Sequence, residues 1–335
     1  MKKVALSFSI LALTALFTIV GCKKEKNVAP EPDTELQSSV DVTYGFFTLT
    51  DIEQWAAFLG ENQLFPKFYM PAAHSTGTIV PNRDTVNKEI KEAFNNTTCV
   101  DGRLRNGSIF MNYNNSAANS KYYHDYQFKA KVILVNYKVD GWSVIPRNGS
   151  QITIENLVSP VNYSTSTTNL SWRIVGDVDL FHPTDSSKDI HMVFDLVKTL
   201  LNTSTSTVFP ASKQAAINWS LAVVGYKGTI YGETSGNVPF KYNIDADHEI
   251  VRNFTCTPDK LYGVNVPPAG TGTTTARFEE YHPFVNGSAA FTTAALYPRV
   301  IHYGPEVPVP NNQAPCDNSG TVTIKGISYP VDFKK

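Results

Sequence analysis

Beyond Cys99, apolar and polar side chains alternate in one short segment after another. A period of two in segments rich in β-branched and aromatic residues is typical of strands that bury one face. Turn dipeptides such as Asp140-Gly141 and Lys325-Gly326 separate neighbouring segments, and their glycine supplies the positive φ of a two-residue hairpin. The candidate strands span 108–113, 127–139, 150–157, 170–181, 189–197, 218–231, 240–244, 249–255, 284–292, 299–303, 321–324 and 327–333.

Hairpin connections pair consecutive strands in antiparallel order, so about twelve such strands predict an all-β fold. We expect a sandwich or a partly closed barrel. The composition favours this class, because only 18% of the residues are charged and the chain has 20 Gly and 20 Pro, which are turn residues. A hydrophobic content of 42% is enough for a buried core and excludes a disordered chain.

Two helical patterns precede the strands, and we expect each to form a short amphipathic helix. Thr50 and Glu53 make a capping box for the first helix, since each side chain can bind a free amide of the first turn. Apolar residues at helical spacing follow as far as Gly60, which is a typical stop. Asp84 is placed to cap the second helix, whose apolar face carries Val86, Ile90, Ala93 and Phe94.

The N-terminus has the features of an export signal. Lys2 and Lys3 precede an uncharged apolar stretch that ends in Ile19-Val20-Gly21-Cys22, directly before a polar run. A basic start, an apolar middle and small residues at the cut describe a secretory signal peptide, here residues 1–21. The last four residues resemble the lipobox of bacterial lipoproteins, in which the cysteine is acylated and becomes the first residue. A retained membrane-spanning helix is the alternative, since the stretch is long enough to cross a bilayer.

These features divide the chain and indicate its partner. Residues 22–40 are predicted to be a lipidated cysteine and a solvated tether, residues 41–98 a helical segment, and residues 99–335 the antiparallel β domain. Two or more acyl chains anchor a protein stably, so an acylated Cys22 makes the membrane a predicted partner. With 29 Lys and Arg against 30 Asp and Glu, the chain lacks the basic excess of a nucleic-acid binder.

Several stretches resemble one protein family. They are Cys99–Ile109, with the pattern Cys-x-Asp-Gly-Arg-x-Arg-x-Gly-x-Ile, then Asn136–Gly141, Ile152–Asn156, and at the C-terminal end Tyr303-Gly304 followed by Cys316–Tyr329, which contains Cys-Asp-Asn-x-Gly-Thr-Val-Thr-Ile-x-Gly. Together with the lipobox they are similar to a family of uncharacterised outer-membrane lipoproteins of the Bacteroidota. The resemblance implies a lipid-anchored all-β protein of the outer membrane and supplies no catalytic residue. Residues 200–214 and the long connection 304–316 depart from the family pattern.

Three cysteines remain after Cys22, namely Cys99, Cys256 and Cys316. An exported protein is in a compartment where disulfides persist, and three thiols allow three pairings. We favour Cys256–Cys316, because both lie near strand ends in the C-terminal third of the chain. The alternative is three reduced cysteines that pack as small apolar residues. No pair has Cys-x-x-Cys spacing, so we expect no metal site.

The sequence lacks a Gly-x-Ser-x-Gly nucleophile elbow, a phosphate-binding P-loop and a dinucleotide fingerprint, and we predict no cofactor. His248-Glu249 starts like the zinc-protease motif, but Arg252 stands where the second histidine belongs. Asp177 and Asp179 share one face of a predicted strand. Because paired carboxylates hydrolyse glycosides, a surface glycan hydrolase is the alternative function.

Tyr122, Tyr123 and Tyr126 lie between two predicted strands. Amphipathic rings suit sugar and protein interfaces, so we consider them ligand contacts; the alternative is that they close the edge of the core. We expect a lipid-anchored outer-membrane lipoprotein that acts as a non-catalytic binding or structural module. Its predicted partners are the membrane and a glycan or an envelope protein, and the sequence decides neither the ligand nor the face of the membrane.

Overall fold

The computed structural model describes residues 35–61, 82–84, 86–99, 103–116, 120, 122–158, 170–202, 217–256, 283–294, 296–304, 316 and 319–331. Within them one helix, α2 (Gln37–Gly60), accompanies 16 strands, which confirms the expected all-β class. The strands are β1 (Asn82–Asp84), β2 (Glu89–Thr98), β3 (Leu104–Asn112), β4 (Lys129–Val139), β5 (Trp142–Pro146), β6 (Ile152–Asn156), β7 (Ser171–Phe181), β8 (Ile190–Leu200), β9 (Val223–Thr234), β10 (Val238–Ile244), β11 (Ile250–Asn253), β12 (Phe284–Asn286), β13 (Ser288–Thr293), β14 (Arg299–Tyr303), β15 (Gly320–Ile324) and β16 (Ile327–Pro330). Three single turns of 3-10 helix are η3 (Arg147–Gly149), η4 (Ser186–Lys188) and η5 (Trp219–Leu221).

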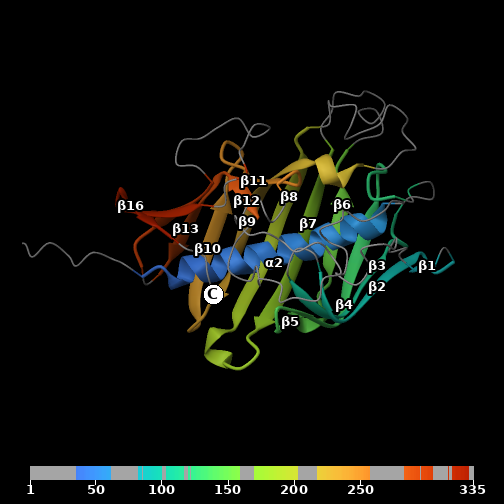
Figure 1. The fold of residues 1–335 in the computed structure, drawn as a ribbon, viewed down its shortest axis with the longest axis horizontal. Helices are drawn as coiled ribbons and strands as arrows, with labels where there is room; N and C mark the ends of the chain where they lie inside the picture. Colours follow the sequence, from blue (N-terminus) through green and yellow to red (C-terminus); the bar gives the residue numbers. More distant parts are fainter. Residues whose placement is uncertain are drawn as a thin grey trace, which may run out of the picture. The chain divides into compact units, whose positions relative to one another are not determined.

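The described strands belong to one antiparallel sheet, whose main path ascends in chain order while β6, β11 and β12 lie off it (Figure 1). The path runs β1-β2-β3-β4-β5-β7-β8-β9-β10-β13-β14-β15-β16. β5 and β6 both pair with β4 and β7, so together they fill one strand position that η3 interrupts. In the same way β10 and β11 both pair with β9. This meander is the topology that hairpin connections predict.

Tight turns join neighbouring strands at one end of the strands. Asp140-Gly141 connects β4 to β5, Ser235–Asn237 connects β9 to β10, and Lys325-Gly326 connects β15 to β16. Lys325 and Gly326 have φ values of 50° and 79°, as a two-residue hairpin requires. The connections at the opposite end of the strands include residues 200–214 and 304–316, most of which lie outside the described residues.

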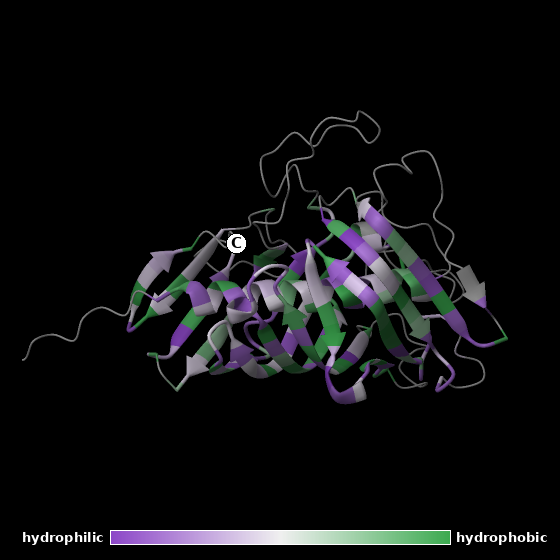
Figure 2. Ribbon diagram, turned by 90° about the horizontal axis from the view of Figure 1, so that it is seen from below, coloured by the Kyte–Doolittle hydropathy of each residue, from purple (hydrophilic) through white to green (hydrophobic). Residues whose placement is uncertain are grey.

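α2 lies across one face of the sheet (Figure 1), and every residue from Ser38 to Gly60 is buried. We call the face of the sheet that contacts α2 the inner face. Along β8 the residues Ile190, Met192, Phe194 and Leu196 are buried on this face, whereas the residues between them are partly exposed. Aromatic contacts join helix and sheet: the rings of Phe46 and Phe284 stack at 4.7 Å, and Trp55 meets Phe94 edge-on at 5.0 Å. Figure 2 shows the alternation of apolar and polar residues along the strands.

The predicted start of the helix at Thr50 is wrong. α2 begins at Gln37, and the Thr50 hydroxyl donates back to the Phe47 carbonyl at 3.0 Å instead of capping a first turn. The segment before Thr50 is rich in Ser, Thr, Val, Tyr and Gly, which form isolated helices poorly. Burial against the sheet overrides that weak intrinsic preference, because tertiary packing supplies most helix stability in proteins.

The predicted second helix is also wrong. Its residues form β1, a turn and β2, with Arg83 opposite Ile90 in the pairing. Asp84 does act as a cap, but for this turn: its Oδ1 accepts hydrogen bonds from the backbone amides of Val86 at 2.9 Å and Asn87 at 3.0 Å. Asp caps turns and helices through the same side-chain contact, so the sequence pattern alone does not distinguish them.

These corrections shift the predicted domain limits. α2 starts inside the predicted tether 22–40, and β1 and β2 lie inside the predicted helical segment 41–98. Helix and sheet share one hydrophobic core within a compact unit from Glu35 to Lys335. Within the described residues, no helix is both long and apolar enough to cross a membrane. The predicted signal peptide and Cys22 lie outside the described residues.

Candidate functional site

The C-terminal half of α2 carries buried carboxylates that face basic side chains of the sheet. Arg105 of β3 binds Asp51 through Nη2, which lies 3.0 Å and 2.9 Å from the two carboxylate oxygens. Arg103 approaches the same carboxylate at 3.7 Å and binds Asp140 through Nε at 2.7 Å. The Arg103 guanidinium also lies 4.2 Å from the centre of the Phe47 ring. Asp51 is thereby neutralised where it is buried.

Lys198 of β8 makes a second buried contact with α2. Its Nζ lies 3.0 Å from both carboxylate oxygens of Glu53 and 3.0 Å from Gln54 Oε1. The Tyr123 hydroxyl donates to the same Glu53 carboxylate, and the Trp219 ring lies 4.2 Å from Nζ. Lys198 and Glu53 are at most 1% exposed, so this ion pair is removed from solvent.

Burial and pairing act in opposite directions on the pKa values of these groups. Burial raises the pKa of Asp51, but Arg105 and Arg103 outweigh it and hold that pKa below its ordinary value. Burial lowers the pKa of Lys198, and Glu53 offsets only part of this effect. Burial, followed by the charge of Glu53, raises the pKa of Tyr123 well above 10.0. Tyr123 therefore stays protonated and donates to Glu53.

The segment Tyr122–Tyr126 closes the C-terminal end of α2. The Tyr123 amide donates to the Gly60 carbonyl at 3.1 Å, and His124 Nδ1 lies 2.6 Å from Glu61 Oε2. Tyr123 is completely buried against the Trp172 ring at 4.7 Å, whereas Tyr122 and Tyr126 are half-buried. Tyr123 thus belongs to the core edge, and a ligand contact by Tyr122 or Tyr126 stays a prediction.

Sequence reasoning missed the buried basic residues, although the alternation pattern contains a signal for them. Lys198 occupies an inner-face position in register with Leu196 and Leu200, where an apolar residue is normal. A charged residue at such a position requires a buried partner of opposite sign. The partner, Glu53, is 145 positions away in the sequence, so spacing alone does not identify it.

Asp177 and Asp179 lie on the outer face of β7, opposite the face that contacts α2. His191 Nε2 is 2.9 Å from Asp177 Oδ1, and Arg147 Nη1 is 3.1 Å from His191 Nδ1. Arg147 Nε also lies 3.7 Å from Asp179. Burial raises the pKa of Asp179, and Arg147 offsets part of the rise. Both carboxylates are thus engaged with basic groups on a partly exposed sheet face.

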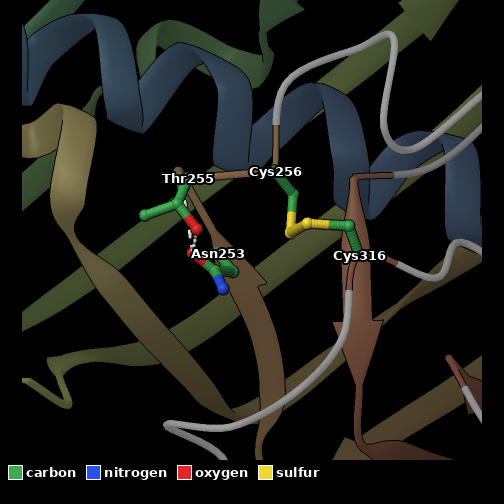
Figure 3. Close-up of a disulfide and its surroundings, with 4 residues drawn as sticks. All are labelled: Asn253, Thr255, Cys256 and Cys316. Carbon is green, nitrogen blue, oxygen red and sulfur yellow. Dashed lines mark hydrogen bonds between the residues drawn. A yellow bond between two sulfur atoms is a disulfide. The ribbon is translucent and has the colours of Figure 1, made fainter.

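The predicted pair Cys256 and Cys316 is bonded in the structure, with Cα atoms 5.2 Å apart (Figure 3). Cys256 follows β11 after a turn in which Asn253 Oδ1 accepts from the amide and the hydroxyl of Thr255, at 3.0 Å and 2.8 Å. The two cysteines belong to a small apolar cluster with Val223, Val251 and Val285. Cys99 is reduced and buried. The disulfide therefore links the end of β11 to the segment that precedes β15.

The zinc-like sequence at His248 does not form a helix. His248 lies in an exposed turn, where Nδ1 is 2.7 Å from Asp245 Oδ1, and Arg252 belongs to β11. Comparison with known proteins finds no matching family model, no matching curated protein and no matching solved structure. The resemblance to Bacteroidota lipoproteins therefore stays a prediction.

Proposed function

We propose that this protein is a lipid-anchored lipoprotein of the outer membrane that acts as a non-catalytic binding or structural module. Acylated Cys22 is its attachment point, and its partner is a glycan or an envelope protein. The lipobox supports the anchor, and one structural observation supports the absence of catalysis: α2 occupies the inner face of the sheet, and sheet residues already bind its buried carboxylates.

This observation supports a binding site away from the inner face. Curved antiparallel sheets commonly hold small ligands against the inner face. Here that face is packed against Phe46, Trp55 and the ion pairs of Asp51 and Glu53. Displacing α2 from this face would leave buried charges without partners, which costs several kcal/mol of free energy. The outer face and the connections are therefore the proposed sites of interaction.

The alternative, a surface glycan hydrolase, depends on Asp177 and Asp179. Such an enzyme needs one protonated and one ionised carboxyl group beside the scissile bond. The raised pKa of Asp179 and the His191 contact of Asp177 fit that division of roles. An enzyme predicts turnover on a glycan panel that Asp177→Asn and Asp179→Asn abolish. A binding module predicts that a glycan binds without turnover.

Protease shaving of intact cells, read by mass spectrometry, tests the location of the module. Release of peptides from 122–126 or 304–315, while a periplasmic marker stays intact, places the domain outside the cell and supports capture of an external partner. Protection until the outer membrane is broken places it in the periplasm and supports a role in the envelope. Recovery of the protein in the cytoplasmic fraction would contradict the proposal.

A further inference from the structure

The described chain begins beside the last strands of the sheet. Glu35 accepts a hydrogen bond from Arg299 Nη1 at its backbone carbonyl, and its carboxylate lies 3.4 Å from the same nitrogen. Arg299 is the first residue of β14 and pairs directly with Ile324 of β15, which pairs with Ile327 of β16. Directly paired residues share a face, so Arg299, Ile324 and Ile327 form one row on the inner face. Glu35 thus marks one end of this row.

Apolar and basic side chains stand exposed next to this point. Ile327 is 56% exposed although its row neighbour Ile324 is buried, and Tyr297 is 39% exposed in the β13–β14 connection. The Tyr297 carbonyl accepts from Arg299 Nε at 3.2 Å, and Lys325 Nζ lies 3.2 Å from the centre of the Tyr297 ring. We call Tyr297, Lys325 and Ile327 the tether-root patch. It joins an aliphatic residue, an amphipathic ring and a cation within one small area.

Such a combination suits a lipid headgroup region. Tyrosine and lysine favour the boundary between water and acyl chains, where the ring or the lysine stem is apolar and the tip stays hydrated. The tether before Glu35 has three lysines and three acidic residues, but Lys23, Lys24 and Lys26 cluster beside Cys22, where they are attracted to an anionic membrane surface as Lys325 is. Thirteen residue steps separate Cys22 from Glu35, so the extended chain spans at most about 45 Å. The tether therefore permits contact without enforcing it.

We propose that the tether-root patch lies on the lipid headgroups of the membrane that holds acylated Cys22, and thereby orients the domain. This inference depends on the proposed lipid anchor. In this orientation the tight turns near β14–β16 lie on the membrane side, and the outer face of β7–β9 stays accessible to a partner.

Quenching by labelled lipids tests this orientation in the full, acylated protein. The variant Ile327→Cys carries a fluorophore, and its matched control is Tyr231→Cys, because Tyr231 is 52% exposed on the outer face of β9. The native cysteines do not react, since Cys99 is buried and Cys256 is bonded to Cys316. Both variants are reconstituted in phosphatidylethanolamine–phosphatidylglycerol vesicles that contain a spin-labelled lipid.

We expect several-fold stronger quenching at position 327 than at position 231. Equal quenching at the two positions, in protein that floats with the vesicles, would overturn the orientation and leave the anchor intact. Protein that does not float with the vesicles would overturn the anchor and the orientation together.

Discussion

Buried charges of this protein depend on partners of opposite charge, and the pair of Lys198 and Glu53 illustrates the consequence. Removing an ion pair from water costs several kcal/mol per ion, so a buried pair adds little net stability. Breaking the pair is different, because the remaining charge keeps its burial cost and loses its compensation. Arg173 and Asp195 make the opposite case on the outer face: their side chains are 50% and 49% exposed, and water screens their contact at 2.6 Å.

Lys198→Met is therefore expected to lower the free energy of unfolding by roughly 3–5 kcal/mol, because Glu53 is left buried without its counter-charge. Lys198→Met combined with Glu53→Gln should recover much of this loss, since the unpaired charge is gone. Arg173→Met is the control and should cost less than about 1 kcal/mol. Urea unfolding measures all three. A loss in Lys198→Met no larger than in Arg173→Met would contradict the burial argument.

Glu92 on β2 provides a test by pH. It shares a face with buried Ile90 and Phe94, and burial raises its pKa from 4.5 to about 7. As the pH rises, the unfolded chain releases the Glu92 proton before the folded protein does. The contribution of protonated Glu92 to the free energy of unfolding is therefore complete below pH 4.5 and is lost as the pH rises through about 7. Glu92→Gln should be more stable than the unchanged protein at about pH 8, by roughly 1–2 kcal/mol.

The gain in Glu92→Gln should vanish at about pH 4, where Glu92 is protonated in both states. Urea unfolding at the two pH values measures it. If the difference in the free energy of unfolding between the variant and the unchanged protein does not vary with pH, burial does not raise the pKa of Glu92.

At the scale of elements, the strands after Cys99 and the end of α2 at Gly60 followed from the sequence, whereas the start of α2 and the hairpin of β1 and β2 did not. Alternation locates β7 and β8 because each buries one face, and Lys325-Gly326 locates a hairpin because only a few residues adopt that backbone. α2 is buried on all sides, so it lacks the apolar stripe that identifies a helix at a surface. The ion pairs of Asp51 and Glu53 join residues far apart in the chain, and a local sequence pattern does not identify such partners.

The fit of α2 against the sheet predicts unequal effects of two similar substitutions. A Cβ added at Gly60 would lie 2.8 Å from the Tyr123 Cβ, an atom that is bonded to the backbone and cannot move away on its own. A Cβ added at Gly45 would meet the end of Met192, a flexible side chain that can move away. Gly60→Ala is therefore expected to cost about 1–3 kcal/mol, although alanine forms helices better than glycine.

Gly45→Ala should cost less than Gly60→Ala, and thermal unfolding compares the two. Equal losses, or a gain in Gly60→Ala, would contradict close packing between the helix end and the segment Tyr122–Tyr126.

At the scale of the whole molecule, the described strands form one sheet with β1 and β16 at its two ends, and α2 packs on its inner face. β16 is an end strand of the sheet path and finishes in Pro330, which has no amide hydrogen to offer a further strand. β1 is the other end of the path and is only 3 residues long. Both features limit edge-to-edge association. The disulfide adds a connection of another kind, between parts of the chain 60 residues apart.

Cys256→Ala with Cys316→Ala is expected to lower the free energy of unfolding by up to about 4 kcal/mol, because the unfolded chain regains the entropy of a long loop. The variant should still fold, since the main core does not include either cysteine. Denaturant unfolding of the oxidised protein and of the variant measures the difference. Equal midpoints would show that the bond does not constrain the unfolded chain.

The most direct measurement is the intact mass and membrane partitioning of the protein expressed in a bacterial host with lipoprotein export, compared with Cys22→Ser. We predict a chain that starts at Cys22, carries the mass of its acyl groups and sediments with membranes. Cys22→Ser should lack the acyl mass and leave the membrane or remain uncleaved. An unacylated chain, or identical mass processing and partitioning of the two proteins, would contradict the lipid anchor.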